Sequence, residues 1–517
     1  MDRRIRFALL AVFFVFSPAR SYGQSAAQLV RQSAAAMGGL KALQALHNQV
    51  VESEGKQFDS SSTQQPLGPT RQINTFHYTL TRHLAEPRLR LQWQTESVTD
   101  NPPLRWVETI NGDVGMLQEE SGRRVEGQAA KPRRLHPGRM ATRLREEIRN
   151  PPKLILTALS SKSLKRLNDV ECEGNTCNVV SFSHGGDEFR VYLEAQTHLP
   201  AKTDILEDDP LEGDSSYMVK YGDWRKVDGV MLPFTLRYEL NGRPLQEEQI
   251  KSIRQNVSLT QDVFQIPTAV RNEKTDAKPV ASQWILRRVA GGVSYQDMGR
   301  PPVIQWIELA PGVYKIQGSS HATIVVEMKD YLVAVEGPLY EARTAPVINS
   351  IKEKFPGKPI RYIIPTHHHL DHAGGIRAFM AEGAIVVAPF SAEAFYQKVA
   401  RAPHTRQPDS LELKKTVVTI EGFGGGAKII GDETHSVEVH PLPLPHADDL
   451  VVVYLPKEKL LIEADHVSPR DGKVRPGPRL DEFIPALDKL HLDVTTIVGI
   501  HGDQATLQAA RAAVKKS

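Results

Sequence analysis

The feature that most constrains this chain is a cluster of four histidines and one aspartate in the segment 362–375, YIIPTHHHLDHAGG. His367 and His369 are two residues apart, so on an extended chain they lie on one side and can hold one ion. Asp371 and His372 follow after the chain turns, so they can face a neighbouring ion. Histidines that only bond to the backbone are the alternative. Five ionisable groups this close together would be costly without a cation, so the segment predicts a site for two metal ions.

The rest of the C-terminal part supports this focus. Twelve of the 18 histidines lie in residues 301–517. Strand-like and helix-like segments alternate there, which predicts an α/β arrangement. The strand-like segments are 312–316, 322–328, 331–336 and 360–364, and the helix-like segments are 342–354, 374–382 and 503–515.

The phrase THHHLDHAGG resembles the T-H-x-H-x-D-H signature of the metallo-β-lactamase superfamily. Asp371 and His372 fix the register, which leaves His368 at a variable position. The resemblance spans about residues 305–510 and implies an αββα sandwich with a dimetal site at the edge between two sheets. It also implies three further ligands, each after a strand-like segment: His446 in LPHADD, Asp465 in EADH and His501 in HGD.

The resemblance divides these ligands between two ions. One ion takes His367, His369 and His446, the other takes Asp371, His372 and His501, and Asp465 bridges both beside a bridging hydroxide. Asp371 is then the predicted catalytic residue, which orients the hydroxide and can pass a proton to the leaving group. Two Zn²⁺ ions are expected because imidazole and carboxylate suit zinc, although iron or manganese fits the same ligands.

The resemblance also narrows the reaction. True metallo-β-lactamases usually carry Cys or Ser where this chain has Asp465, and acyl-homoserine lactonases typically carry Tyr where it has Ser468. The expected activity is hydrolysis of an ester, lactone, thioester or amide bond in a small-molecule substrate. Two alternatives stay open: an iron-dependent redox enzyme of the same fold, and a cell-envelope protein that binds a lipophilic ligand.

Several neighbouring residues depart from the pattern or could join the site. Glu-Gly-Pro at 336–338 replaces the usual Asp-Thr-Gly, and His-Ala-Asp-Asp at 446–449 replaces His-Thr-Pro-Gly. Both changes alter the groups that orient the ligands. His440 and His466 are either substrate-facing or structural, and the basic loop 470–475 either binds an anionic substrate or is a solvated loop.

Residues 1–23 have the parts of a secretory signal peptide: a basic start, the ten-residue apolar run FALLAVFFVF and a small residue, Gly23, at the expected cleavage point. Ten residues cannot cross a ~30 Å hydrocarbon core as a helix. We therefore expect a periplasmic or secreted protein without a transmembrane segment in the mature chain. In such a compartment Cys172 and Cys177 suit a disulfide, with free thiols or metal ligands as alternatives. A net charge of +3 gives no case for a nucleic-acid partner.

Residues 24–270 read as a β-rich accessory domain, joined by a linker at 271–300 to the hydrolase domain at 301–517. A helix is expected at 25–46 with an interruption at Gly38-Gly39, a helical insertion at 140–159, and surface loops at 59–70 and 121–138. The alternating segments 88–95, 188–194, 217–221 and 234–240 predict an antiparallel sheet with hairpins.

The Gly-Gly helix, the phrase YGDWRKVDGVMLPFTLRYELNG at 221–242 and VFQIPTAV at 263–270 resemble the periplasmic lipoprotein-carrier half-barrels. This resemblance implies a curved antiparallel sheet wrapped around a helix, with a lipid or acyl ligand. An accessory domain without a ligand is the alternative. The fold class expected for the whole chain is therefore α+β, with this sheet domain followed by the αββα sandwich.

Overall fold

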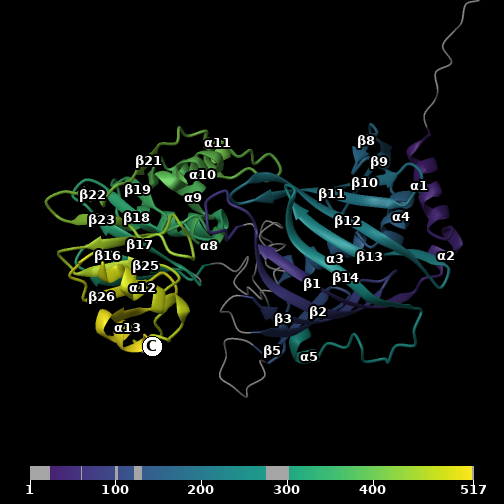
Figure 1. Ribbon diagram of the computed structural model, residues 1–517, viewed down its shortest axis with the longest axis horizontal. Coiled ribbons are helices and arrows are strands. Elements are labelled where there is room, and N and C mark those ends of the chain that lie inside the picture. The colour runs from purple at the N-terminus through teal and green to yellow at the C-terminus, as the bar shows by residue number, and fades with distance from the viewer. Residues whose placement is uncertain are drawn as a thin grey trace, which may run out of the picture.

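The computed structural model describes residues 24–59, 61–98, 103–121, 131–274, 302–318 and 320–514. An N-terminal sheet and a C-terminal pair of smaller sheets lie side by side (Figure 1). The predicted signal peptide and most of the predicted linker lie outside the described residues. Among the helices that are described, none is both long enough and apolar enough to cross a membrane.

The N-terminal part forms one antiparallel 14-stranded sheet with the order β6-β5-β4-β3-β2-β1-β14-β13-β12-β11-β10-β9-β7, to which β8 is added through β9. Its strands are β1 Asn48–Asp59, β2 Arg71–His83, β3 Arg88–Ser97, β4 Leu104–Asn111, β5 Val114–Ser121, β6 Arg133–Arg134, β7 Lys165–Arg166, β8 Val170–Cys172, β9 Asn175–His184, β10 Asp187–Glu194, β11 Pro200–Asp209, β12 Gly213–Val227, β13 Val230–Leu240 and β14 Arg243–Gln255. The predicted antiparallel sheet is confirmed.

The alternating sequence explains the two faces of this sheet. In β3, Leu89, Leu91 and Trp93 are buried, while the residues between them are partly or fully exposed. Successive side chains of a strand point to opposite faces, so these three meet the helices on one side. The helices of this part are α1 Ala26–Ala36, α2 Leu40–Gln44, α3 Pro137–Ile148, α4 Pro151–Ser160 and α5 Thr268–Arg271.

The predicted interruption of the first helix is confirmed and has a steric reason. Gly38 and Gly39 adopt φ values of 117° and 96°, in the region that favours glycine. A Cβ atom on Gly38 would lie 2.5 Å from the carbonyl oxygen of Gly229. The chain therefore needs glycine where α1 turns into α2 against the β12–β13 hairpin.

Buried charges fix α3 to the sheet. Glu108 of β4 is fully buried and pairs with Arg139 and Arg143 of α3. Burial alone would raise the pKa of Glu108, but the two guanidinium groups outweigh it and lower the pKa to about 2. A carboxylate at this place therefore stays charged at neutral pH and holds the helix in position.

Another buried carboxylate of the sheet has a raised pKa, because the effect of its burial is not outweighed by arginine side chains. Glu248 of β14 accepts a hydrogen bond of 2.8 Å from the hydroxyl of Tyr78, and burial raises its pKa to about 7. Since the folded pKa lies above the unfolded value, the folded state loses stability as pH rises from about 4.5 to about 7.

We therefore expect Glu248→Gln to raise the free energy of unfolding at pH 8 by about 3 kcal/mol, at ~1.4 kcal/mol per pKa unit, and to change it little at pH 4. Urea unfolding at both pH values measures this difference. Glu247→Gln is the matched control, because the Glu247 side chain is 43% exposed. An equal effect of the two substitutions at pH 8 would contradict the prediction.

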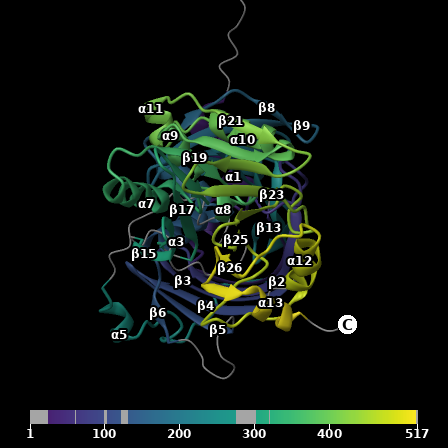
Figure 2. The same cartoon turned by 90° about the vertical axis from the view of Figure 1, so that its left-hand side faces the viewer.

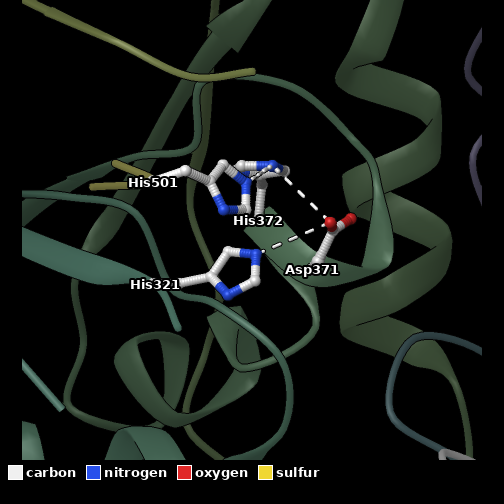
Figure 3. Close-up of side chains that lie close together, drawn as sticks. All are labelled: His321, Asp371, His372 and His501. Atoms are coloured by element: carbon white, nitrogen blue, oxygen red, sulfur yellow. Dashed lines mark hydrogen bonds and ion pairs between the residues drawn. The ribbon is translucent and has the colours of Figure 1, made fainter. Parts of the chain in front are cut away.

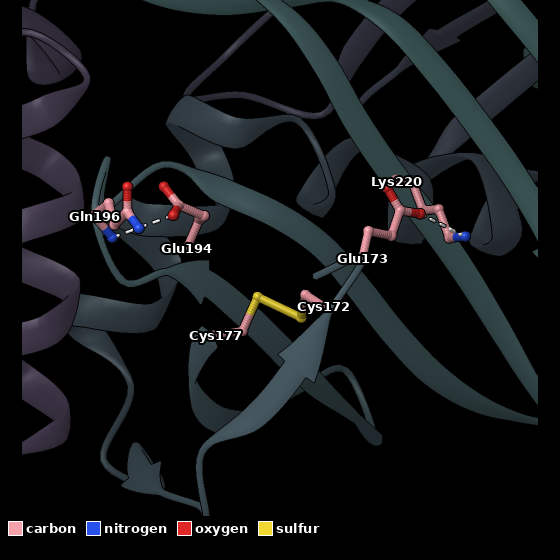
Figure 4. Close-up of a disulfide and its surroundings, with 6 residues drawn as sticks. All are labelled: Cys172, Glu173, Cys177, Glu194, Gln196 and Lys220. Carbon is pink, nitrogen blue, oxygen red and sulfur yellow. Dashed lines mark hydrogen bonds and ion pairs between the residues drawn. A yellow bond between two sulfur atoms is a disulfide. The ribbon is translucent and has the colours of Figure 1, made fainter. Parts of the chain in front are cut away.

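The predicted disulfide is present. Cys172 at the end of β8 pairs with Cys177 in β9 across the turn at Glu173 and Gly174 (Figure 4). Both of these turn residues have positive φ, as a tight connection between adjacent strands requires.

The C-terminal part contains a seven-stranded sheet in the order β15-β16-β17-β18-β19-β20-β21 and a six-stranded sheet in the order β22-β23-β24-β25-β26-β27. The first consists of β15 Gln305–Ala310, β16 Val313–Gln317, β17 Ala322–Glu327, β18 Leu332–Val335, β19 Ile360–Ile364, β20 Ile385–Pro389 and β21 Ile420–Phe423. The second consists of β22 Lys428–Gly431, β23 Ser436–Pro441, β24 Val451–Leu455, β25 Leu460–Glu463, β26 Thr496–Gly499 and β27 Gln504–Thr506.

The apolar residues of these strands belong to three clusters. One cluster, including Val335, Ile364 and Val453, joins the two sheets. Helices pack on the other sides, with Val347 of one helix against the first sheet and Phe483 of another against the second. The helices are α7 Glu341–Lys354, α8 Leu370–Ala373, α9 Ile376–Ala381, α10 Phe390–Arg401, α11 Ser410–Lys414, α12 Pro478–Asp488 and α13 Leu507–Ala513.

One predicted helix begins later than expected. The segment 503–515 opens with β27, which pairs with β26, and α13 starts only at Leu507. The hydroxyl of Thr506 accepts a hydrogen bond from the Ala509 backbone N–H and caps the helix. The N-cap residue, rather than the helical periodicity, therefore sets the boundary.

Among the residues that the structure describes, hydrogen bonds join the sheet domain to the C-terminal part at two segments. The segment 403–406 lies on the β11–β12 hairpin, where His404 is 2.8 Å from Asp208 and Asp214 donates its N–H to Pro403 over 2.7 Å. The other contact is the loop that follows β1, which was predicted as a surface loop. The loop is confirmed and exposes Gln64, Gln65 and Leu67, but it is not wholly at the surface, because Ser61 and Thr63 are buried and Thr63 contacts His368 and His369. The other predicted loop, 121–138, lies partly outside the described residues and contains β6 and the start of α3.

Candidate metal centre

The histidine cluster lies after the ends of strands of the two C-terminal sheets. Figure 2 labels helix α8, which contains two of its residues. The chain leaves β19 at Ile364, passes through His367 and His369, and enters the short helix α8. Gly374 and Gly375 follow. A Cβ atom on Gly374 would lie 2.1 Å from the carbonyl oxygen of Leu339, and one on Gly375 would lie 2.1 Å from the hydroxyl oxygen of Thr344, so neither position has room for a side chain.

All seven residues that the sequence singles out come together at this place. Four of them lie in the segment 367–372, and the other three, His446, Asp465 and His501, follow β23, β25 and β26 respectively. The residues form two groups in which the ligand atoms lie within 4.8 Å of one another, and the second group includes one histidine that the sequence reasoning missed. The first group is His367, His369, His446 and Asp465, and the second is His321, Asp371, His372 and His501.

In the first group, three imidazole nitrogens converge. Nε2 of His367 lies 3.0 Å from Nδ1 of His369 and 3.3 Å from Nε2 of His446. In the second group, Nε2 of His501 lies 3.3 Å from Nε2 of His372, and Asp371 lies beside them (Figure 3). Nitrogen lone pairs that converge at these distances repel one another unless a proton or a cation lies between them.

Asp465 lies between the two groups. One of its carboxylate oxygens is 2.8 Å from Nε2 of His446, and the other is 2.7 Å from Nε2 of His501 and 3.2 Å from Nε2 of His372. Its backbone has a φ of 73°, a conformation in which Asp is one of the better tolerated side chains. A single carboxylate therefore touches the histidines of both groups.

The ring nitrogens that face away from the site are held by the protein. Nε2 of His369 lies 2.9 Å from the carbonyl oxygen of Thr63, so it must donate a proton there. Nδ1 of His372 lies 2.6 Å from Glu336 and likewise donates. These bonds leave a lone pair on the inner nitrogen of each ring, as a metal ligand requires. The donor set therefore fits two cations.

The electrostatics of the two groups agree with this assignment. Burial, followed by the neighbouring histidines, lowers the pKa of His367 and His369 well below the ordinary value, so both rings are neutral. Burial also opposes protonation of His372, but Glu336, Asp465 and Asp371 outweigh it and raise its pKa. Burial would raise the pKa of Asp465, but His372 and His501 lower it well below the ordinary value. A cation binds in place of a proton in such a set.

Sequence reasoning missed three contributors besides His321. The loop at 61–70 belongs to the sheet domain, yet its Thr63 touches His369, and Arg71, the first residue of β2, donates to the carbonyl oxygen of His446 over 3.4 Å. Glu336 was not missed, because the sequence predicts that the change at 336–338 alters the groups that orient the ligands, and Glu336 holds the ring of His372. Arg479, at the start of α12, lies 3.4 Å from the carboxylate of Asp465. Only the Glu336 position carried a local signal.

The remaining candidates have structural partners. His368 lies 2.6 Å from Asp449 and 3.0 Å from the hydroxyl of Thr63, which leaves it outside both groups. His440 pairs with Glu438 at 3.0 Å. The ring of His466 stacks on Phe483, and burial lowers its pKa to about 4. The basic side chains Arg470, Lys473 and Arg475 are exposed.

Comparison with known proteins agrees with this site. Residues 338–501 match the family model described as the metallo-beta-lactamase superfamily, and this stretch contains all seven predicted ligands. This match is to the superfamily whose motif the segment THHHLDHAGG resembles. A comparison with curated proteins finds no match.

Solved structures of low identity also align with the chain. The metallo-beta-lactamase from Pontibacter korlensis is 19% identical, with a TM-score of 0.31, over 40% of this chain and 95% of that one. The metallo beta lactamase from Hirschia baltica is 18% identical, with a TM-score of 0.30, over 41% and 99%. The flavodiiron protein from Giardia intestinalis is 16% identical, with a TM-score of 0.31, over 41% and 58%.

Proposed function

We propose that this protein is an exported, dinuclear, metal-dependent hydrolase that cleaves an ester, lactone, thioester or amide bond in a small molecule. The observation that carries the proposal is the position of Asp465, whose two oxygens touch histidines of two separate groups. The proposed architecture is an αββα sandwich, supported by apolar clusters that join sheet to sheet and helices to each sheet.

The seven residues would divide between two ions. His367, His369 and His446 would hold one, Asp371, His372 and His501 the other, and Asp465 both. Zinc is proposed because imidazole and carboxylate form its usual ligand set. Two such cations would supply Lewis acidity toward the substrate carbonyl and lower the pKa of water to about 7.

The side chains then have distinct tasks. Asp371 is 16% exposed, so its carboxylate can reach both the buried site and a bound substrate. It takes the proton of the attacking water at its carboxylate oxygen and passes it to the leaving group. Glu336 and the carbonyl oxygen of Thr63 hold the rings of His372 and His369 in place. These contacts keep the two rings in fixed positions, and a fixed geometry lowers the barrier of the reaction.

Arg479 favours substrates that carry negative charge. Its side chain is 40% exposed and its guanidinium lies 3.4 Å from Asp465, at the open side of the site. A guanidinium there can pair with a carboxylate or phosphate group on the substrate. The exposed basic loop at 470–475 adds positive charge nearby, so it can attract an anion without contacting it.

Metal removal tests the proposal. We expect the purified protein to contain two zinc ions per chain, to lose hydrolysis of an ester, lactone or thioester panel after dialysis against a chelator, and to regain it with Zn²⁺. A β-lactam is included in the panel and is expected to be a poor substrate. Activity that survives metal removal would refute the proposal, and oxygen consumption restored by iron would favour the redox alternative.

The lipid or acyl ligand proposed for the sheet domain has a candidate location. A cavity of about 130 Å³ lies between the sheet and the start of α4, with Leu80, Leu91, Trp93 and Ile250 among its lining residues. This volume is below the ≈300 Å³ of ordinary small-molecule pockets, so an acyl chain requires the helices to move. Mass spectrometry of organic extracts of the full chain tests for such a ligand.

A further inference from the structure

His321 immediately precedes β17 and is not one of the ligands that the family motif implies. It lies outside the stretch matched by the family model, which begins at residue 338. Its side chain is 1% exposed. The structure nevertheless places it in the second group, with Asp371, His372 and His501 (Figure 3).

The ring is oriented with one nitrogen toward the protein and the other toward the site. Nδ1 of His321 lies 2.8 Å from the hydroxyl of Ser320. Nε2 is buried and has no hydrogen-bond partner among the described residues, and the Asp371 carboxylate is 3.5 Å away. Because nearly all buried polar atoms in proteins have a hydrogen-bond partner, a buried nitrogen without one that faces a carboxylate and other metal-binding side chains needs an explanation.

The backbone of His321 is tied to the strands that build the site. Its carbonyl oxygen accepts a hydrogen bond from Arg343 of α7, and the next residue, Ala322, donates its N–H to Ile500 over 3.1 Å. The His321 ring is therefore held 4.1 Å, centroid to centroid, from the ring of His501. This position is fixed by packing rather than by a flexible loop.

We propose that Nε2 of His321 is a further protein ligand of the second cation, beside Asp371, His372 and His501. This inference rests on the proposed dinuclear site and refines it. The four donor atoms already lie within 4.8 Å of one another, so small side-chain movements bring them to the ≈2.0–2.2 Å of zinc bonds. With Asp465 shared, five residues would hold the second cation and four the first, so the first cation would have more room for a water or substrate ligand.

Cobalt substitution tests this without measuring hydrolysis. In the Co²⁺-loaded full chain, each cobalt-bound histidine gives a strongly shifted N–H proton resonance. We expect the His321 N–H to be among the shifted resonances of the wild type. In His321→Phe we expect that resonance to disappear and the dissociation constant of the second Co²⁺ to rise at least about 100-fold, with the first site unchanged.

Matched phenylalanine variants separate the outcomes. His501→Phe should lose the second cation, and His440→Phe should bind both as the wild type does. If His501→Phe loses the second cation but His321→Phe retains wild-type affinity, the further ligand is refuted while the dinuclear site stands. An unshifted His321 resonance in the wild type also refutes it, whether or not the variant folds. A wild type that binds no cobalt refutes both proposals.

Discussion

Replacing Asp465 with Asn is expected to remove both cations and to lower hydrolysis by at least about a thousandfold. The carboxylate contacts His446, His372 and His501, so its charge is shared by both groups. Substitutions of outer-shell partners alone cost about 10- to 100-fold in metal affinity or activity, so loss of a shared ligand should cost more. Asn is preferred to Ala because residue 465 has a φ of 73°, which Asn tolerates better. Metal analysis of the purified variant, together with its kcat/KM, measures both effects.

The matched control is His440→Ala. His440 is a histidine of the same sheet region that pairs with Glu438 and belongs to neither group. It should keep wild-type metal content and activity. Stoichiometric metal and unchanged hydrolysis in Asp465→Asn would rule out the shared-carboxylate site on which the proposed function depends.

The second large effect concerns the loop that the sheet domain inserts into the site. Asp59 and Arg71 face each other across the β1–β2 hairpin, so the residues between them can be replaced by Asn-Gly, a two-residue hairpin turn. The replacement deletes the carbonyl oxygens of Thr63 and Ser61, which accept from His369 and from the Leu370 backbone N–H. We expect the dissociation constant of the first cation to rise about 10- to 100-fold, because His369 loses the partner that fixes its ring.

A side-chain substitution separates the backbone carbonyl from the rest of the loop. Thr63→Val removes the hydroxyl that contacts His368 but keeps the carbonyl oxygen that faces His369. It should bind the first cation nearly as the wild type does. If the variant with the shortened hairpin also keeps wild-type affinity and a folded sheet domain, the loop only covers the site and does not position His369.

The sequence determined the chemistry of the site because most of its ligands are encoded locally. His367, His369, Asp371 and His372 lie within six consecutive residues, in the segment after β19 and in the short helix α8, so their spacing alone predicts two ions. The three distant ligands, His446, Asp465 and His501, were located through the family resemblance, which implies ligands in this order after strand-like segments. Local rules also sufficed for the disulfide and for the break at Gly38-Gly39, since both depend on residues close in sequence.

Only the tertiary structure decided which groups surround those ligands. Thr63 is more than 300 residues from His369, and its contribution is a backbone carbonyl, which has no signature in any sequence. His321 reaches the site because Ala322, the next residue, bonds to the backbone of Ile500, beside His501. Arg479 reaches the site from the start of α12. A polar stretch such as the loop at 61–70 is expected to face solvent. Its polarity, however, does not show whether a polar group bonds to water or to another part of the protein. Contacts between distant segments follow from the balance of packing over the whole chain, which no local pattern contains.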